Sequence, residues 1–219
     1  MPKAVDSVIF DFGGPVVRTP FEMVRDFERR RGLPERTLDW GGPFDPDADR
    51  AWRKVLSGEL KERDYWRLRA KEFARFTGSS DIRSMLDALY DVSAELAVRP
   101  EAEQMLIDIK TAGLRSAILT NDMGMFHSPQ FLASVRFIAE VDVVVDASTT
   151  NVLKPDPRAY LDVLRALGSS PQCAVFTDDM PHNIRGANAV GMCAIWFDVR
   201  DPRGSYAELA RAAGFRQAC

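Results

Sequence analysis

Runs of apolar residues alternate with stretches of helical periodicity along most of this chain, and the alternation predicts its fold. The first run, Val8-Ile9-Phe10, is rich in residues that favour strands and is typical of a strand buried on both faces. Further strands are expected at 115–119, 141–145, 173–176 and 192–197, and helices at 101–112, 156–167, 181–190 and 204–213. Strands that alternate with helices form parallel sheets covered on both faces, so the sequence predicts an α/β protein with a doubly wound parallel sheet.

The stretch from Thr19 to about Val98 has a different pattern, with helical periodicity and no convincing strand. Helices are expected there at 21–31, 47–56, 61–76 and 81–96, with a loop at 40–46. The first strand must join the sheet that the later strands form. We therefore interpret the helical stretch as an insertion that follows the first strand.

The composition excludes several classes of protein. The chain has 219 residues, of which 46% are hydrophobic, enough for one domain or for one core with an inserted piece. A formal charge of -3 gives no reason to expect a nucleic-acid or membrane partner. No apolar run approaches membrane-spanning length, and no signal-peptide pattern precedes the first strand.

The cysteines indicate the redox environment. Cys173, Cys193 and Cys219 are few, odd in number and without metal-site spacing. They favour a reduced, cytoplasmic compartment. Cys173 and Cys193 each open an apolar run, and we expect both to be small core residues.

Polar residues follow the predicted strands at the points where three of them end. Asp11 comes directly after the first strand, Thr120-Asn121 after a later one, and Asp178-Asp179 after another. Because the carboxyl ends of parallel strands meet at one edge of a sheet, we expect these side chains to converge there. Each has a plainer interpretation taken alone, since strand-end Thr residues are common and Asp residues often cap helices.

These residue types together point to phosphate chemistry. Carboxylates gathered at one edge repel one another unless a cation joins them, and all-oxygen ligands suit Mg²⁺. Lys154, which alone would be read as a solvated surface residue, could join Mg²⁺ in binding a phosphate. Thr120 would add a hydroxyl donor, and the backbone around Phe12 and Gly13 would add N–H groups. Asp11 could then form an aspartyl-phosphate.

Four segments of the chain resemble motifs of the haloacid dehalogenase-like hydrolase superfamily. They are VIFDFGG, AILTN, LKPDPRAY and VFTDDMPHNIRGANAVGM, in that order. The resemblance covers nearly the whole chain and extends to capped phosphatases such as the phosphatase domain of soluble epoxide hydrolase. It implies a Rossmann-like core, residues 1–18 and 99–219, and an all-helical cap, residues 19–98, on hinges near Arg18 and Arg99-Pro100.

The resemblance also implies roles for individual residues. Asp11 would be the nucleophile, and Thr120 and Lys154 would hold the phosphoryl oxygens. The expected magnesium ligands are the carboxylates of Asp11, Asp178 and Asp179 and the carbonyl of Gly13. The expected substrate contacts are Phe12, Gly13, Asn121 and Asn183, the last as an orienting residue.

Gly13 departs from the pattern of these phosphatases, which usually place there a second Asp that protonates the leaving group. General acid–base help is worth on the order of 10²–10⁴ in rate. Asp122, His127 and His182 are conceivable replacements; His127 is expected on a helix facing solvent and His182 in a loop. Without a replacement, turnover should depend steeply on the basicity of the leaving group.

The sequence favours a magnesium-dependent phosphatase acting on a small phosphorylated metabolite, as a monomer or homodimer. Two alternatives remain: a metal-independent 2-haloacid dehalogenase, and a catalytically degenerate module that binds phosphate or a metabolite. Substrate specificity would come from the cap, and the candidate contacts, each expected rather to pack among helices, are Arg18, Phe21, Trp40, Phe44, Trp52 and Trp66.

Overall fold

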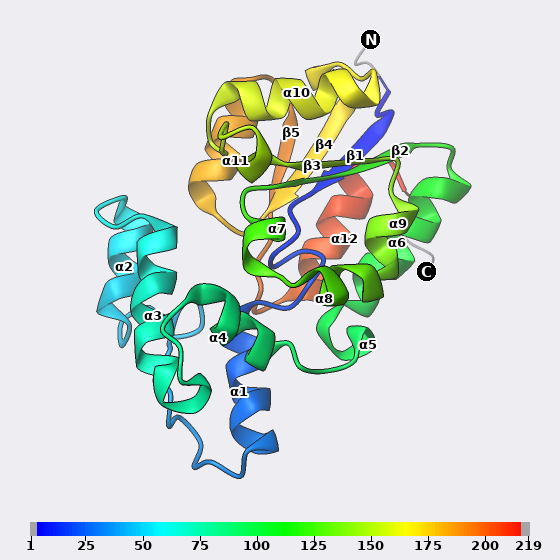
Figure 1. Ribbon diagram of the computed structural model, residues 1–219. Coiled ribbons are helices and arrows are strands. Elements are labelled where there is room, and N and C mark those ends of the chain that lie inside the picture. The colour runs from blue at the N-terminus through cyan, green and yellow to red at the C-terminus, as the bar shows by residue number, and fades with distance from the viewer. Residues whose placement is uncertain (1–3, 216–219) are drawn as a thin grey trace.

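The computed structural model describes residues 4–215 and has a parallel sheet at its centre (Figure 1). The strand order is β3-β2-β1-β4-β5. The strands are β1 (Ser7–Phe10), β2 (Arg115–Thr120), β3 (Val143–Asp146), β4 (Ala174–Asp178) and β5 (Cys193–Trp196). All pairings are parallel, which confirms the predicted α/β, Rossmann-like, doubly wound fold.

The central position of β1 explains its apolar sequence. It pairs with β2 on one side and β4 on the other, and its four residues are fully buried. Ile9 packs into a cluster with Tyr160 and Phe176, whereas Val8 and Phe10 belong to the second, larger cluster on the opposite face. Alternating side chains of one strand therefore hold both layers of helices to the sheet.

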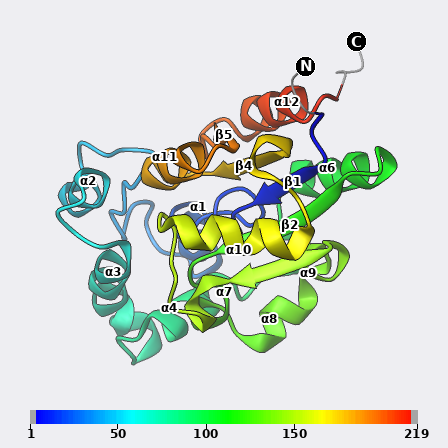
Figure 2. The ribbon, with the colours of Figure 1, turned by 90° about the horizontal axis from the view of Figure 1, so that it is seen from above.

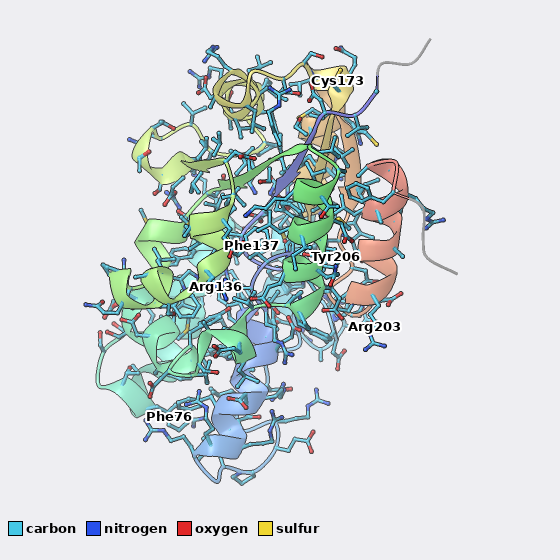
Figure 3. All side chains as sticks on the ribbon, turned by 90° about the vertical axis from the view of Figure 1, so that its right-hand side faces the viewer. Phe76, Arg136, Phe137, Cys173, Arg203 and Tyr206 are labelled. Carbon is cyan, nitrogen blue, oxygen red and sulfur yellow. The ribbon has the colours of Figure 1, made fainter. Side chains whose placement is uncertain are left out.

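Helices cover both faces of the sheet. On one face lie α10 (Pro157–Leu167) and α11 (Pro181–Ala189), and on the other α6 (Pro100–Thr111) and α12 (Pro202–Ala212). Tyr206 of α12, labelled in Figure 3, donates a hydrogen bond from its hydroxyl to the carbonyl of Pro15, 2.9 Å away. Phe137 packs edge-on against Phe10, with ring centroids 5.4 Å apart. These contacts support β1 and the loop that follows it.

The helical segment between β1 and α6 stands beyond the carboxyl ends of the strands (Figures 1 and 2). It contains α1 (Pro20–Arg30), α2 (Arg50–Ser57), α3 (Glu62–Thr77), α4 (Ile82–Leu89) and α5 (Ala94–Ala97). Its two connections to the rest of the chain run side by side, because Arg18 N donates to Ala97 O (2.8 Å) and Arg99 N donates to Val16 O (2.9 Å). That these connections act as hinges of a cap remains a prediction.

Two parts of the sequence were predicted incompletely. The single helix expected over 81–96 is interrupted after Leu89, and Ser93, in extended conformation, is the N-cap residue that precedes the separate helix α5. Between β2 and β3 lie three short helices that the periodicity did not reveal: α7 (Met123–Phe126), α8 (Pro129–Ser134) and α9 (Arg136–Glu140). Helices of four to six residues are too short to show an apolar period.

The cysteines divide between core and surface. Cys173 is buried, as predicted, but Cys193 is exposed. The prediction for Cys193 was wrong because Cys193 is the first residue of β5, an edge strand that pairs with β4 on one side only, so it lies at the margin of the sheet. Cys219 lies outside the described residues. Within residues 4–215, no helix has the length and apolarity needed to cross a membrane.

Candidate active site

The polar strand-end residues converge at one edge of the sheet, facing the helical segment. Asp11, Asp178 and Asp179 each offer a carboxylate oxygen, and these oxygens lie within 4.8 Å of one another. Asp11 and Asp179 line a cavity between this edge and the helices. The other predicted site residues on its wall are Phe12, Gly13, Thr120, Asn121, Lys154 and Asn183.

Asp11 follows the buried strand β1, and the polar contacts of its side chain involve one of the two carboxylate oxygens. Its Oδ1 accepts a hydrogen bond from Phe12 N at 2.7 Å and forms an ion pair with Lys154 Nζ at 2.8 Å. Within residues 4–215 its Oδ2 has no hydrogen-bond partner. Burial raises the pKa of Asp11 to about 7, although Lys154 opposes the shift. A further cation beside this carboxyl group would favour its ionised form.

Lys154 is buried between two carboxylates. Its Nζ lies 2.8 Å from Asp11 Oδ1 and 2.7 Å from Asp178 Oδ2. Burial by itself lowers the pKa of Lys154, but Asp11 and Asp178 outweigh it and raise that pKa above its ordinary value. Asn121 holds the backbone of Lys154 at both its N–H (2.8 Å) and its carbonyl (3.1 Å). Asn121, predicted as a substrate contact, thus positions the lysine.

The adjacent carboxylates of Asp178 and Asp179 have different surroundings. Asp178 is fully buried and accepts hydrogen bonds from Lys154 Nζ, Met180 N (2.8 Å) and Asn183 Nδ2 (3.0 and 3.1 Å). Among the described residues, the carboxylate of Asp179 has no hydrogen-bond partner. Burial and the charges of Asp178 and Asp11 raise the pKa of Asp179 well above its ordinary value. Asp179 is therefore the carboxylate that most needs a cation.

Two glycines shape the loop after β1. Gly14 has φ +87°, and a Cβ there would lie 2.9 Å from Cγ and Oδ2 of Asp179, so glycine leaves the room that the carboxylate occupies. A Cβ at Gly13 would meet no atom of the described residues within 4 Å. Position 13 therefore has room for a larger side chain.

The residues present fit a magnesium ion. The donor set is entirely oxygen, which Mg²⁺ prefers. Among residues 4–215, the buried Oδ1 of Asn183 has no hydrogen-bond partner, and the clustered carboxylates of Asp11 and Asp179 have raised pKa values that a cation would reverse. Asp11, Asp178, Asp179 and the carbonyl of Gly13 are the groups that could hold it.

The helical segment supplies the apolar wall of the cavity. Of the specificity candidates, Phe21, Trp52 and Trp66 lie on this wall. Arg18, Trp40 and Phe44 instead border a separate hollow on the helical segment. The cavity also receives Glu62 from the first turn of α3, a residue that the sequence analysis did not single out.

The three replacement proton donors considered from sequence are placed unfavourably. His127 is not solvent-facing as expected but buried among Phe12, Tyr90 and Phe131, and burial lowers its pKa to about 4. His182 lies in helix α11 rather than in a loop, and burial lowers its pKa too. The carboxylate of Asp122 is occupied by an ion pair with Arg63.

The pair between Arg63 and Asp122 joins α3 to the segment after β2. Arg63 Nε lies 2.9 Å and 3.1 Å from the two carboxylate oxygens, and a second guanidinium nitrogen also donates to Asp122. Arg83 of α4 adds a hydrogen bond to Gly124 O at 2.7 Å. The helical segment is thus fastened over the cavity by polar contacts on one side.

We expect Arg63→Ala to raise KM and to cost about 1–3 kcal/mol of stability, because it leaves the half-buried Asp122 unpaired. Arg67→Ala is the matched control, since Arg67 lies on the same helix in an exposed pair with Asp64. Thermal denaturation and steady-state kinetics on both variants measure the difference. Equal behaviour of the two variants would contradict a fastening role for Arg63.

The chain is similar to several known proteins. A family model described as haloacid dehalogenase-like hydrolase matches residues 5–191. Phosphatase MT3486 of Mycobacterium tuberculosis is 29% identical over 201 residues, which are 89% of this chain and 88% of that protein. Acyl-CoA dehydrogenase family member 10 of Mus musculus is 28% identical over 97% of this chain, which spans only 20% of that protein's length.

Structural similarity concerns the fold alone. The crystal structure of a HAD phosphatase from Thermococcus onnurineus matches with a TM-score of 0.60 at 20% identity, covering 98% of this chain and 100% of that one.

By sequence, bifunctional epoxide hydrolase 2 and (S)-2-haloacid dehalogenases are also among the similar proteins.

Proposed function

The chain belongs to the haloacid dehalogenase-like hydrolase family, and within that family we propose that it is a magnesium-dependent phosphatase of small phosphate monoesters. The observation that carries the proposal is the group of three carboxylate oxygens within 4.8 Å of one another, beside a buried lysine. A metal-independent dehalogenase has no need of such a cluster. A phosphatase needs it to bring a phosphate dianion to a carboxylate nucleophile.

The charged groups on the cavity wall support the same choice. Phosphatases and dehalogenases both occur among the relatives, so the relatives alone do not separate the two reactions. Among the described residues that line the cavity, no arginine is present to bind a halide, and Lys154 is the side chain with a permanent positive charge. A buried lysine beside the nucleophile suits phosphoryl oxygens.

In the proposed reaction Asp11 attacks phosphorus through Oδ2, the oxygen that accepts no hydrogen bond from the described residues. Lys154 and the hydroxyl of Thr120 hold the phosphoryl oxygens, and Asn121 keeps the lysine in position. When bound, the metal ion would neutralise the carboxylates and the charge that develops on the phosphoryl group. The aromatic wall from the helical segment would cover the ester group and exclude water.

A direct assay tests the proposal against its alternatives. We expect phosphate release from 4-nitrophenyl phosphate and from a panel of phosphorylated metabolites, dependent on Mg²⁺ and abolished by excess chelator. Halide release from 2-haloacids that persists in chelator would establish the dehalogenase instead. Binding of phosphate without turnover of any ester would establish a degenerate binding module.

A further inference from the structure

Glu62 is the carboxyl group of the helical segment that reaches the cavity. It is the first residue of α3, and it lines the same cavity as Asp11 and Gly13. The ion pair between the neighbouring Arg63 and Asp122 holds this turn of α3 against the segment that follows Thr120. The placement of Glu62 over the strand edge therefore follows from contacts of its own helix.

One oxygen of Glu62 is fixed and the other is available. Trp66, one turn further along α3, donates from Nε1 to Glu62 Oε1 at 3.2 Å. In the described part of the chain, Oε2 has no hydrogen-bond partner, and Glu62 makes no hydrogen bond to Asp11, Asp178 or Asp179. The carboxyl group is thus oriented but not engaged in the carboxylate cluster.

The surroundings of Glu62 raise the pKa of its carboxyl group above the ordinary value. Burial raises its pKa, the carboxylates of Asp122 and Asp178 add to the shift, and Trp66 and Lys154 oppose it. The other charged groups facing it are Asp179 and Arg63. A raised pKa is what a general acid working near neutral pH requires.

We propose that Glu62 is the proton donor and acceptor of this site, delivered by the helical segment in place of the acid that Gly13 lacks. This inference rests on the proposed phosphatase function. It explains how an ester with a basic leaving group could be cleaved although the usual position of the acid is empty. It also makes assembly of the helical segment over the edge a condition for proton transfer.

The proposed reaction has two steps, and atoms and protons balance in each. Oδ2 of Asp11 attacks phosphorus, the bond from phosphorus to the ester oxygen breaks, and the proton of Glu62 passes to that oxygen to release an alcohol. Ionised Glu62 then takes a proton from water, whose oxygen attacks the phosphorus of the aspartyl-phosphate. The bond to Asp11 breaks, the electron pair returns to its carboxylate, inorganic phosphate leaves, and Glu62 is protonated again.

The variant Glu62→Gln keeps the size and the hydrogen bond to Trp66 but cannot transfer the proton. The substrates are phenyl phosphates of graded leaving-group pKa and benzyl phosphate. We expect a shallow dependence on leaving group in the wild type and a steep one in the variant, with benzyl phosphate slower by about 10²–10⁴. With 4-nitrophenyl phosphate the variant should accumulate phosphorylated Asp11, detectable by mass spectrometry, because water is no longer activated.

Controls separate a chemical from a structural role. Asp64→Asn removes an exposed carboxylate of the same helical turn and should behave as wild type. Mg²⁺ affinity of Glu62→Gln, measured by calorimetry, should be unchanged. Adding Gly13→Asp to Glu62→Gln should restore the shallow dependence, since the space at Gly13 is open.

Three results would overturn the inference. Glu62→Gln could keep the wild-type dependence of rate on leaving-group pKa without accumulating phosphoenzyme. That result would refute the proton-transfer role of Glu62 and leave the phosphatase function standing. The variant could lose phosphorylation of Asp11 even from 4-nitrophenyl phosphate, which assigns Glu62 a structural role. Absence of ester turnover in the wild type would refute the phosphatase function itself, and Glu62 with it.

Discussion

Asp11→Asn is expected to lower phosphatase turnover by on the order of 10⁴–10⁶, the scale of losing a catalytic nucleophile. The amide keeps the shape of the side chain, but it has no negatively charged oxygen to attack phosphorus. The fold should survive, because Asp11 lines the cavity and the strand before it is held by its apolar residues. Turnover with 4-nitrophenyl phosphate and circular dichroism measure both effects.

The same variant makes a prediction about pH. In metal-free protein the pKa of Asp11 is raised from 3.8 to about 7, so the folded state binds its proton more tightly than the unfolded state. The stability that this provides is complete below pH 3.8 and is lost as pH rises through about 7. In chelator, wild-type stability should therefore fall from pH 4 to pH 8 more steeply than that of Asp11→Asn.

Denaturant titrations of both proteins at several pH values measure this difference. If stability falls with pH equally steeply in the wild type and in Asp11→Asn, the result would contradict the buried position of the Asp11 carboxyl group. Phosphate trapped on another residue of the wild type would contradict its role as nucleophile, and that result would stand whatever the stability data show.

The sequence predicted the strand-edge part of the site because that part is local. Asp11 and Asp178-Asp179 come directly after strands, and strand order alone brings them together. Lys154 was placed with them by its motif, and the structure puts its Nζ within 2.8 Å of Asp11 and 2.7 Å of Asp178. Parallel pairing converts positions along the chain into neighbours in space.

The helical side of the site could not be predicted in the same way. Glu62 stands in the sequence Lys61-Glu62-Arg63-Asp64, which reads as an ordinary solvated first turn of a helix. His127 follows the short helix α7 and is buried by Tyr90, which comes from the helical segment. Both placements depend on how two parts of the chain pack together, and no local pattern encodes that packing.

A matched pair of substitutions distinguishes the roles of the adjacent residues Asp178 and Asp179. The carboxylate of Asp179 makes no hydrogen bond within the described chain and is repelled by Asp178 and Asp11. Asp179→Asn should therefore abolish Mg²⁺ binding and turnover while leaving the metal-free protein as stable as the wild type or more so. Asp178→Asn should instead destabilise the metal-free protein by about 3–5 kcal/mol, because it disrupts the buried pair with Lys154.

Thermal denaturation with and without Mg²⁺ distinguishes the two effects. At a Mg²⁺ concentration of about 100 times Kd, the wild type should gain about 2.7 kcal/mol of stability, and Asp179→Asn should gain none. A retained Mg²⁺ stabilisation in Asp179→Asn would refute direct metal ligation by this residue. A metal-free stability of Asp178→Asn equal to that of the wild type would show that Lys154 needs only Asp11. The two variants make the same chemical change, from a carboxylate to an amide, at neighbouring positions. If one substitution lowers the metal-free stability and the other raises it, the difference comes from the hydrogen bonds that Asp178 makes and Asp179 does not make within the described residues.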